Sequence, residues 1–336
     1  MAIIEFSGNS PACLKDINRR LVEIDATPNE KIGQHFLVNQ EAIDLLRQTV
    51  APGSTVIEVG SGPGHVTERL AEHAAKLYGI EIDRRYHPLL DKISRDRGNV
   101  EIIYGDALKV DFNRLLPTGR DNDGQVVASL PFHIIEPFVQ KVALLRLSAV
   151  TLVVGRRYAD SLAASYEVGF LGRLSILTST FFDVDTLATV KKDGFSPVPG
   201  TDSAIVQLWP KDAEELDADR RATVFRHMFL TTRRNSTVRK GLKEGLDAFE
   251  RSRDGAGFSK RERNRKSRHS TRLRMREIIE NWVEGSADQD DELPLNRISA
   301  KNKDTINRLG LPSSLLDKPF SLLNNNELRM LYESLE

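Results

Sequence analysis

A glycine-rich stretch at residues 55–64 carries the residue types of a nucleotide-binding turn. It reads Thr-Val-Ile-Glu-Val-Gly-Ser-Gly-Pro-Gly, and a segment compatible with a helix follows from Val66. Glycines let a backbone approach a ligand closely, and the first turn of a helix offers free N–H groups. The spacing is Gly-x-Gly-x-Gly and not the dinucleotide pattern, and Glu58 lies two positions before the first glycine. This combination favours S-adenosylmethionine over a dinucleotide, although an ordinary tight turn has a similar composition.

Two carboxylates follow the next apolar runs of the chain. Glu81 lies about 20 residues beyond the glycine turn, where an acid in a βαβ nucleotide fold accepts hydrogen bonds from both ribose hydroxyls. Asp106 follows the apolar run at 100–104 and could accept the adenine amino group. The simpler alternatives are a solvated strand-end carboxylate for Glu81 and a turn cap for Asp106.

The elements that must position these side chains are short strands alternating with helices. The predicted strands are 56–59, Lys76–Ile82, Val100–Tyr104, Gln125–Ala128 and Val150–Val154. The alternation predicts a doubly wound α/β domain with a parallel sheet, whose strand ends would carry the glycine turn and both acids. Two further strands, Thr178–Val190 and Ser203–Trp209, are expected to close the sheet as a hairpin.

Composition restricts the class of protein and its compartment. The chain has 336 residues, so we expect two domains. Lys+Arg and Asp+Glu both number 48, so net charge gives no sign of a nucleic-acid partner. The single cysteine, Cys13, excludes an intramolecular disulfide and is consistent with a reducing cytoplasm. No apolar run is long enough for a membrane helix, and the N-terminus lacks the layout of a signal peptide. We therefore expect a cytoplasmic protein without a membrane partner.

The predicted organisation has three parts. Residues 1–30 form an N-terminal extension with one amphipathic helix, residues 31–210 the α/β domain, and residues 211–336 a smaller α-helical domain. A strongly basic insert at about 251–276 interrupts the helical domain, and is either a solvated linker or an arm that grips RNA through its phosphates.

Seven motifs in order resemble those of the ribosomal RNA adenine-N6 dimethyltransferases, the KsgA and Erm group. They are Gly-Gln-His-Phe-Leu at 33–37, Glu-Val-Gly-Ser-Gly-Pro-Gly at 58–64, Glu-Ile-Asp at 81–83, Gly-Asp-Ala at 105–107, Ser-Leu-Pro-Phe at 129–132, Gly-Arg-Leu-Ser at 172–175, and the stretch from Phe195 through Val206. The resemblance covers about residues 32–210, and the helical tail more loosely. It implies a Rossmann-like methyltransferase domain that binds S-adenosylmethionine.

The resemblance also implies roles for individual residues. His35 and Leu37 would line the methionine end of the cofactor, and Gly60 would lie under its sulfonium and carboxylate. Glu81 would hold the ribose and Asp106 the adenine, in agreement with the residue-level interpretation of both acids. Ser129 would also belong to the cofactor-binding residues. We expect no metal site.

The expected catalytic residues are Ser129, Leu130, Pro131 and Phe132. In-line methyl transfer to an exocyclic amine needs acceptors that orient the amine and an aromatic face that stacks the extruded adenine. Leu130 and Pro131 would position the amine and Phe132 would stack the base. The family usually has asparagine where this chain has Ser129, a shorter side chain that is a poorer match for two amine hydrogens. His133 also replaces a common asparagine.

The expected substrate is ribosomal RNA. Gly155-Arg156-Arg157 replaces the family's usual Gln-Lys-Glu, and with Arg233, Arg234 and Arg239 it supplies the predicted RNA-binding residues. The leading hypothesis is a monomeric enzyme that methylates adenine N6 of ribosomal RNA, in rRNA processing and maturation more than in antibiotic resistance. The alternatives are a non-catalytic RNA-binding or ribosome assembly factor, and a methyltransferase acting on another nucleic acid.

Overall fold

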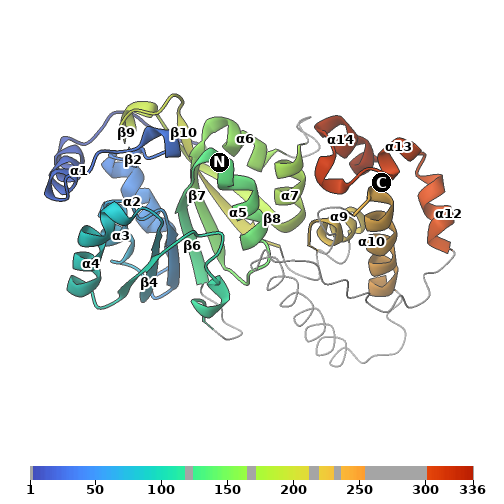
Figure 1. The fold of residues 1–336 in the computed structure, drawn as a ribbon, viewed down its shortest axis with the longest axis horizontal. Helices are drawn as coiled ribbons and strands as arrows, with labels where there is room; N and C mark the ends of the chain where they lie inside the picture. The colour runs from blue at the N-terminus through green and yellow to red at the C-terminus, as the bar shows by residue number, and fades with distance from the viewer. Residues whose placement is uncertain are drawn as a thin grey trace. The chain divides into compact units, whose positions relative to one another are not determined.

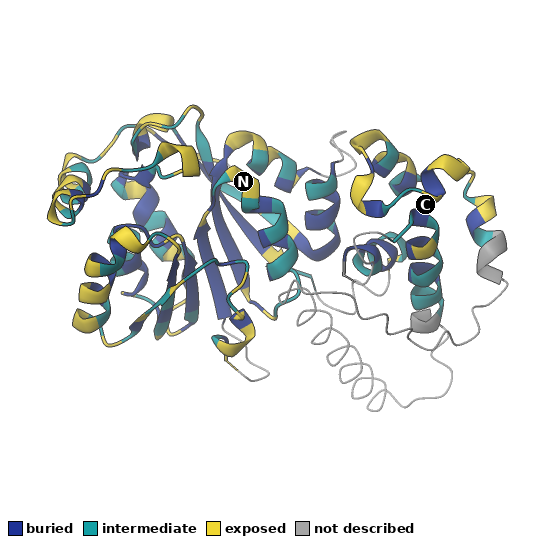
Figure 2. Cartoon of the chain, in the orientation of Figure 1, coloured by how far each residue is buried: buried dark blue, intermediate teal, exposed yellow. Residues whose placement is uncertain are grey.

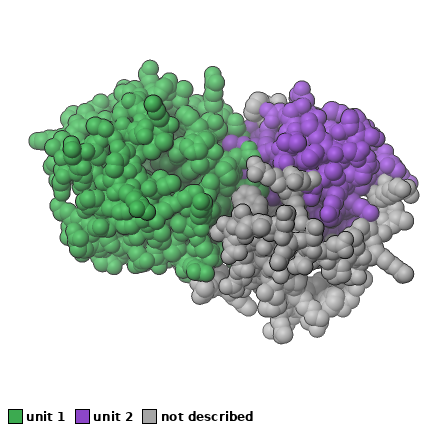
Figure 3. Space-filling view, in the orientation of Figure 1, with its two compact units in different colours: residues 1–163, 182–210 green, residues 164–181, 211–336 purple. Residues whose placement is uncertain are grey.

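The computed structural model describes residues 3–117, 124–164, 172–211, 219–230, 236–253 and 301–335. These residues form two compact units, coloured separately in Figure 3: Met1–Ala163 with Phe182–Pro210, and Ala164–Phe181 with Lys211–Glu336. The predicted domain boundaries at residues 30 and 210 stay predictions, because packing into units does not test which segments fold independently.

The first unit is built on one twisted sheet (Figure 1). Within the described residues it has eight strands in the order β1-β8-β10-β7-β6-β3-β4-β5. Their bounds are β1 Ile4–Phe6, β8 Phe182–Val190, β10 Ser203–Pro210, β7 Ala149–Gly155, β6 Gly124–Ser129, β3 Thr55–Val59, β4 Lys76–Glu81 and β5 Val100–Tyr104. Strands β7, β6, β3, β4 and β5 are mutually parallel, and β10 is antiparallel to both of its neighbours. The predicted Rossmann-like fold is confirmed.

Helices α3, α4 and α5 connect successive parallel strands. The first unit contains helices α1 Pro11–Glu23, α2 Gln40–Thr49, α3 His65–Leu70, α4 His87–Asp96, α5 Ile135–Val142 and α6 Arg156–Ala163. Two short strands, β2 Phe36–Leu37 and β9 Phe195–Ser196, pair antiparallel outside the main sheet. The second unit is helical: α7 Arg173–Phe181, α9 Arg220–Leu230, α10 Val238–Arg253, α12 Lys301–Arg308, α13 Ser313–Leu316 and α14 Asn325–Glu333. None of the described helices is long and apolar enough to cross a membrane.

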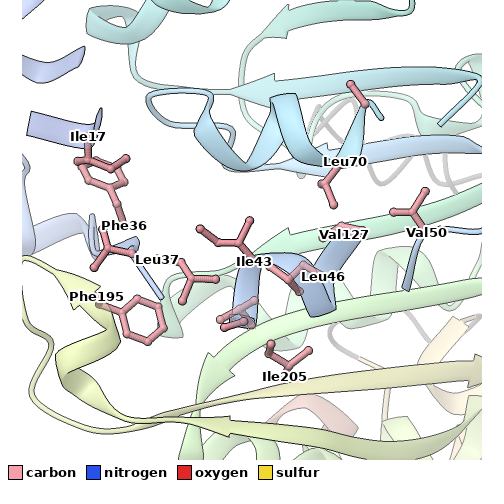
Figure 4. Packing of buried hydrophobic residues seen from close by; sticks show 14 of the residues in the cluster. Ile17, Phe36, Leu37, Ile43, Leu46, Val50, Leu70, Val127, Phe195 and Ile205 are labelled. Atoms are coloured by element: carbon pink, nitrogen blue, oxygen red, sulfur yellow. The ribbon is translucent and has the colours of Figure 1, made fainter. Parts of the chain in front are cut away.

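The hydrophobic core fixes the sheet against α1 to α4. Alternate strand residues point to one face, where Val127 and Ile205 meet Ile43 and Leu46 of α2 (Figure 4). Ile17 of α1 belongs to the same cluster. Figure 2 shows the central strands almost wholly buried and the outer faces of the helices exposed. The strand ends that carry the predicted ligand residues are therefore held on a rigid support.

The prediction of a strand from Thr178 is wrong for its first residues. Arg173–Phe181 is helix α7, and β8 begins only at Phe182. β-branched and aromatic residues favour a strand at 178–182. In the structure, the hydroxyls of Thr178 and Thr180 donate to the carbonyls of Leu174 and Ile176, four residues earlier. Such bonds satisfy the polar side chains inside a helix, so the propensity does not decide the conformation.

Candidate functional site

The glycine turn follows β3 and leads into α3. Gly60 has φ +83°, a conformation that favours glycine, and a Cβ added there would lie 3.1 Å from the carbonyl oxygen of Ser129. Gly64 has φ +82°, and a Cβ added there would lie 2.2 Å from the Cδ1 atom of Ile93. Glycine at position 60 therefore lets the backbone of Ser129 approach the turn, and glycine at position 64 lets the turn pack closely against α4.

Glu81 lies at the carboxyl end of β4 beside this turn. The amide of Gly62 donates to its Oε2 at 2.7 Å, and the amide of Asp83 donates to its Oε1 at 2.7 Å. The residue is 6% exposed, and burial raises its pKa above the ordinary glutamate value. The amide of Ile82 also interacts with this carboxylate. The lone pairs that remain on its two oxygens can accept further hydrogen bonds, as a vicinal diol would supply.

Asp106 lies next to Glu81 at the edge of the sheet. The amide of Gly105 donates to the carbonyl of Glu81 at 2.9 Å, which joins the ends of β4 and β5. Asp106 Oδ1 accepts a hydrogen bond from the amide of Leu108 at 2.9 Å. The turn cap, which was the simpler alternative predicted for Asp106, is therefore present. Its second carboxylate oxygen has no hydrogen bond among the described residues, and it is the one that could serve a ligand.

Lys141 of α5 supports the loop that follows Asp106. Its Nζ donates to the carbonyl of Leu108 at 3.0 Å and to that of Val110, and it lies 4.4 Å from the ring centroid of Phe112. Burial lowers the pKa of Lys141 to about 8, against the opposing effect of nearby Asp111 and Asp106. The lysine holds this loop through two backbone carbonyls.

His35 and Leu37 belong to a segment that pairs with β9. Leu37 lies opposite Phe195 in the β2–β9 pair, and His35 Nδ1 donates to the carbonyl of Pro197 at 2.9 Å. The side chain of Leu37 is 6% exposed and packs in the core, and its carbonyl accepts from His65 Nε2 at 2.9 Å. The motif at 33–37 and the start of the motif at 195–206 thus lie together in the fold. The contact of both residues with a cofactor stays a prediction.

The Ser-Leu-Pro-Phe motif lies at the end of β6. Ser129 is exposed, and its carbonyl faces Gly60, as described above. The amide of Leu130 donates to the carbonyl of Val153 in β7 at 3.3 Å, while the Leu130 side chain is buried. Phe132 is 54% exposed and lies on Tyr158 of α6, with ring centroids 5.3 Å apart. The sheet therefore places Gly60, Glu81, Asp106 and Ser129 along one edge.

The predicted RNA-binding arginines differ in their surroundings. Arg156 is exposed, yet it donates to Asp160 at 3.1 Å and to Thr189 at 3.0 Å. Arg157 beside it is exposed, and no ion pair engages it within the described residues. Arg239, in the second unit, pairs with Asp317 at 2.9 Å. Arg233 and Arg234 lie outside the described residues, and so does the basic insert predicted at about 251–276, except for residues 251–253, which end helix α10.

Two residues of the site were not predicted from the sequence. Gln34 Nε2 donates to Asp83 Oδ2 at 2.7 Å and so connects the 33–37 segment to the end of β4. The Arg85 side chain also binds Asp83 and lowers the pKa of that carboxyl to about 2.

Tyr158 is the second residue that was not predicted. It lies three residues beyond the end of β7, and Phe132 likewise lies three residues beyond Ser129, the end of β6. That matching offset after neighbouring parallel strands was the available signal.

The residues at this edge fit an adenosyl cofactor. Glu81 offers two acceptor oxygens to a ribose, Asp106 offers one to an adenine amino group, and the turn at Gly60 admits a ligand close to the backbone. Ile82, which follows Glu81 in the sequence, is 66% exposed, so an apolar surface is also available next to that acid.

Comparisons with known proteins relate the chain to rRNA-modifying enzymes. The sequence model of the family "Ribosomal RNA adenine dimethylase" matches residues 26–255. The ribosomal RNA small subunit methyltransferase A of Pelotomaculum thermopropionicum is 33% identical over 259 residues, which cover 71% of this chain and 86% of that protein. The enzyme of the same name from Bacillus cereus is 34% identical over 236 residues, covering 67% of this chain and 80% of that protein.

Among solved structures, the fold is similar to a dimethyladenosine transferase from Plasmodium falciparum. The TM-score is 0.51 at 23% sequence identity, and the match covers 89% of this chain and 97% of that one. At this identity the likeness supports the fold alone.

Proposed function

Because the chain belongs to the ribosomal RNA adenine dimethylase family, we propose that it transfers methyl groups from S-adenosylmethionine to adenine N6 of small-subunit ribosomal RNA. The family match spans the glycine turn, both acids and the Ser-Leu-Pro-Phe motif. Relatives more than 30% identical carry the name of small-subunit rRNA methyltransferase A. The observation that carries the proposal is the alignment of Gly60, Glu81, Asp106 and Ser129 along one sheet edge. A non-catalytic RNA-binding role would not require this set.

Glu81, Asp106 and Gly60 would hold the cofactor. Glu81 accepts hydrogen bonds from the two ribose hydroxyls with the lone pairs that its backbone contacts leave. Asp106 accepts from the adenine amino group with the carboxylate oxygen that does not cap its loop. When bound, S-adenosylmethionine supplies an electrophilic methyl group on a sulfonium, close to the turn at Gly60.

Ser129 to Phe132 would orient the acceptor amine. The hydroxyl of Ser129 and the carbonyl of Leu130 accept hydrogen bonds from the amine and direct its lone pair outward. Pro131 fixes the backbone, and Phe132 stacks the adenine after it leaves its helix. Holding the amine in line is the main contribution that this chain makes to the rate, because an attacking amine loses its proton readily afterwards.

We further propose that the protein acts as a monomer in the cytoplasm, with a ribosomal subunit or its RNA as partner. The single cysteine is consistent with a reducing compartment. Arg156, Arg157 and Arg239 are exposed or half-exposed cations that suit phosphate contacts, which give affinity without sequence information.

Transfer of tritiated methyl groups to ribosomal RNA tests the proposal. We expect label on unmethylated small-subunit RNA, and less on large-subunit RNA. Glu81→Ala should abolish transfer and cofactor binding together. Glu101→Ala is the matched control, because that acid lies on neighbouring β5 with its side chain 54% exposed and paired with Lys76. Cofactor binding by the wild type without transfer to any RNA would contradict the proposal.

A further inference from the structure

Phe132 lies against a second aromatic ring. Tyr158 stacks on it with centroids 5.3 Å apart and only 8° between the ring planes. Phe132 follows β6 and Tyr158 follows β7, and these strands are parallel neighbours, so the sheet brings the two rings together. An offset, near-parallel pair at this distance is a favourable aromatic arrangement. Even so, Phe132 stays 54% exposed.

Gly155, the last residue of β7, leaves the space that this ring needs. A Cβ added there would lie 2.8 Å from the Cε1 atom of Phe132, closer than two carbon atoms can approach. The ring of Phe132 is therefore bounded on one face by Tyr158 and at one edge by the backbone of Gly155. The exposed part of Phe132 must lie outside these two contacts, which leaves the ring face opposite Tyr158 for a ligand.

A nucleobase cannot enter between the two rings. Two ring planes that hold a base between them are roughly 7 Å apart, twice the ~3.5 Å contact distance of stacked carbon atoms. The centroids of Phe132 and Tyr158 are only 5.3 Å apart. The free face of Phe132 is thus the one on which a base can stack.

We propose that Tyr158 is a positioning residue for the acceptor adenine. It holds the Phe132 ring in one orientation, so that a base turned out of its RNA meets a platform that is already formed. An exposed phenylalanine without such support exchanges between rotamers, and ordering it on binding costs free energy. The catalytic role of this platform, the Phe132 ring supported by Tyr158, rests on the proposed function. The ability of a base to stack on Phe132 does not.

Kinetics of Tyr158 variants test the role in catalysis. Phosphate contacts dominate RNA affinity, so KM for RNA should change less than twofold, while kcat of Tyr158→Leu falls about three- to tenfold. Tyr158→Phe keeps the ring and should restore kcat. Tyr78→Leu is the matched control, since Tyr78 is a half-buried tyrosine of β4 in the same unit. Cofactor stoichiometry, measured by calorimetry, should be equal in all of them. A kcat of Tyr158→Leu equal to that of wild type or of Tyr78→Leu would overturn the inference.

Fluorescence separates this inference from the proposed function. The probe is a single-stranded adenosine decanucleotide with 2-aminopurine at its centre, titrated to saturation in the presence of S-adenosylhomocysteine. Stacking on an aromatic ring quenches 2-aminopurine, so wild type should quench at least threefold more than Phe132→Leu or Tyr158→Leu. Such quenching without methyl transfer to any RNA would sink the proposed function and leave the platform. Methyl transfer with equal quenching by Tyr158→Leu and wild type would sink the platform alone.

Discussion

Glu58 and Glu81 are both buried glutamates beside the glycine turn, yet only Glu81 can serve a ligand. Glu58 Oε2 accepts from Ser61 Oγ at 2.8 Å and from Thr67 Oγ1 at 2.6 Å, beneath the turn. The oxygens of Glu81 accept from backbone amides at the strand end. The sequence predicted Glu81 from its distance to the turn. It could not separate the structural role of Glu58 from a ligand role, because both acids follow apolar residues.

Glu58 is expected to make stability depend on pH. Burial, opposed by the hydrogen bonds from Thr67 and Ser61, raises the pKa of Glu58 from 4.5 to about 7. The folded state therefore binds this proton more tightly than the unfolded state, and the resulting stability is fully present below pH 4.5 and lost as pH rises through about 7. The loss amounts to about 3 kcal/mol. Glu58→Gln keeps an acceptor oxygen and removes the titration.

Urea unfolding at several pH values measures this effect. The free energy of unfolding of Glu58→Gln, relative to wild type, should rise between pH 4.5 and 8 and then stay constant. A difference that does not change with pH would show that Glu58 titrates normally in the folded protein. The side-chain amide of Glu58→Gln does not titrate in this range. Hydrogen bonds that it gains or loses therefore change the difference in free energy of unfolding by the same amount at every pH.

Ser129 is expected to contribute to the rate through its hydroxyl. Ser129→Ala removes one acceptor of the substrate amine, and loss of a positioned polar group costs on the order of 100-fold in kcat. Ser129→Asn supplies a longer acceptor and should raise kcat above the wild-type value. Single-turnover methyl transfer at saturating RNA measures both. An unchanged rate for Ser129→Ala would exclude the hydroxyl from orienting the amine.

The parallel strands were predictable from the sequence because continuous apolar runs are typical of buried strands between helices. Val100–Tyr104 matches its prediction, and the strands at 76–81 and 149–155 differ from theirs by one residue at one or both ends. Strand β1 was not predicted, since a strand of only three residues has no measurable alternation. It forms because β8 offers an edge to pair with. Helix α6 was not predicted either, and Tyr158 was missed with it.

Lys141 is expected to support cofactor binding by holding the loop after β5. Lys141→Met keeps much of the apolar stem but removes the donor to Leu108 and Val110, so the loop that carries Asp106 becomes less ordered. We expect the Kd for S-adenosylhomocysteine, measured by calorimetry, to increase about three- to tenfold, the cost of losing about 1 kcal/mol of hydrogen bonding. Lys109→Met is the matched control, because the Lys109 side chain is exposed on the same loop. Equal Kd values for both variants would contradict the prediction.

Residues 1–25, which precede the part of the chain that matches the family, belong to the first compact unit. The match begins at residue 26, whereas β1 and α1 lie before it. Ile17 is 1% exposed in the common core, and the amide of Lys191 donates to the carbonyl of Phe6. The sequence predicted the amphipathic helix from its spacing. It could not show that this helix reaches the glycine turn, because that contact depends on tertiary packing.

Arg20 of α1 is expected to couple this segment to cofactor binding. Its guanidinium donates to the carbonyl of Pro63 at 3.1 Å, pairs with Glu68 of α3, and binds Asp16 at 2.6 Å. Arg20→Met removes the donor to the Pro63 carbonyl and to Glu68, whereas Asp16 keeps its bond from Arg19. The Arg20 side chain is only 11% exposed, so this loss costs about 2 kcal/mol. Pro63 lies between Gly62 and Gly64 in the glycine turn, and the amide of Gly62 donates to Glu81. Without the bond from Arg20 to Pro63 the turn is less ordered, so ligand binding must order it again.

The Kd for S-adenosylhomocysteine should therefore increase at least threefold in Arg20→Met, together with a lower Tm. Arg19→Met is the matched control, because Arg19 lies on the same helix, pairs with the same Asp16, and is 60% exposed. It should leave the Kd unchanged, since Arg19 does not contact the turn. A lower Tm with an unchanged Kd in Arg20→Met would limit α1 to stability. An equal loss of affinity in both variants would assign the effect to Asp16 and the charge of the helix.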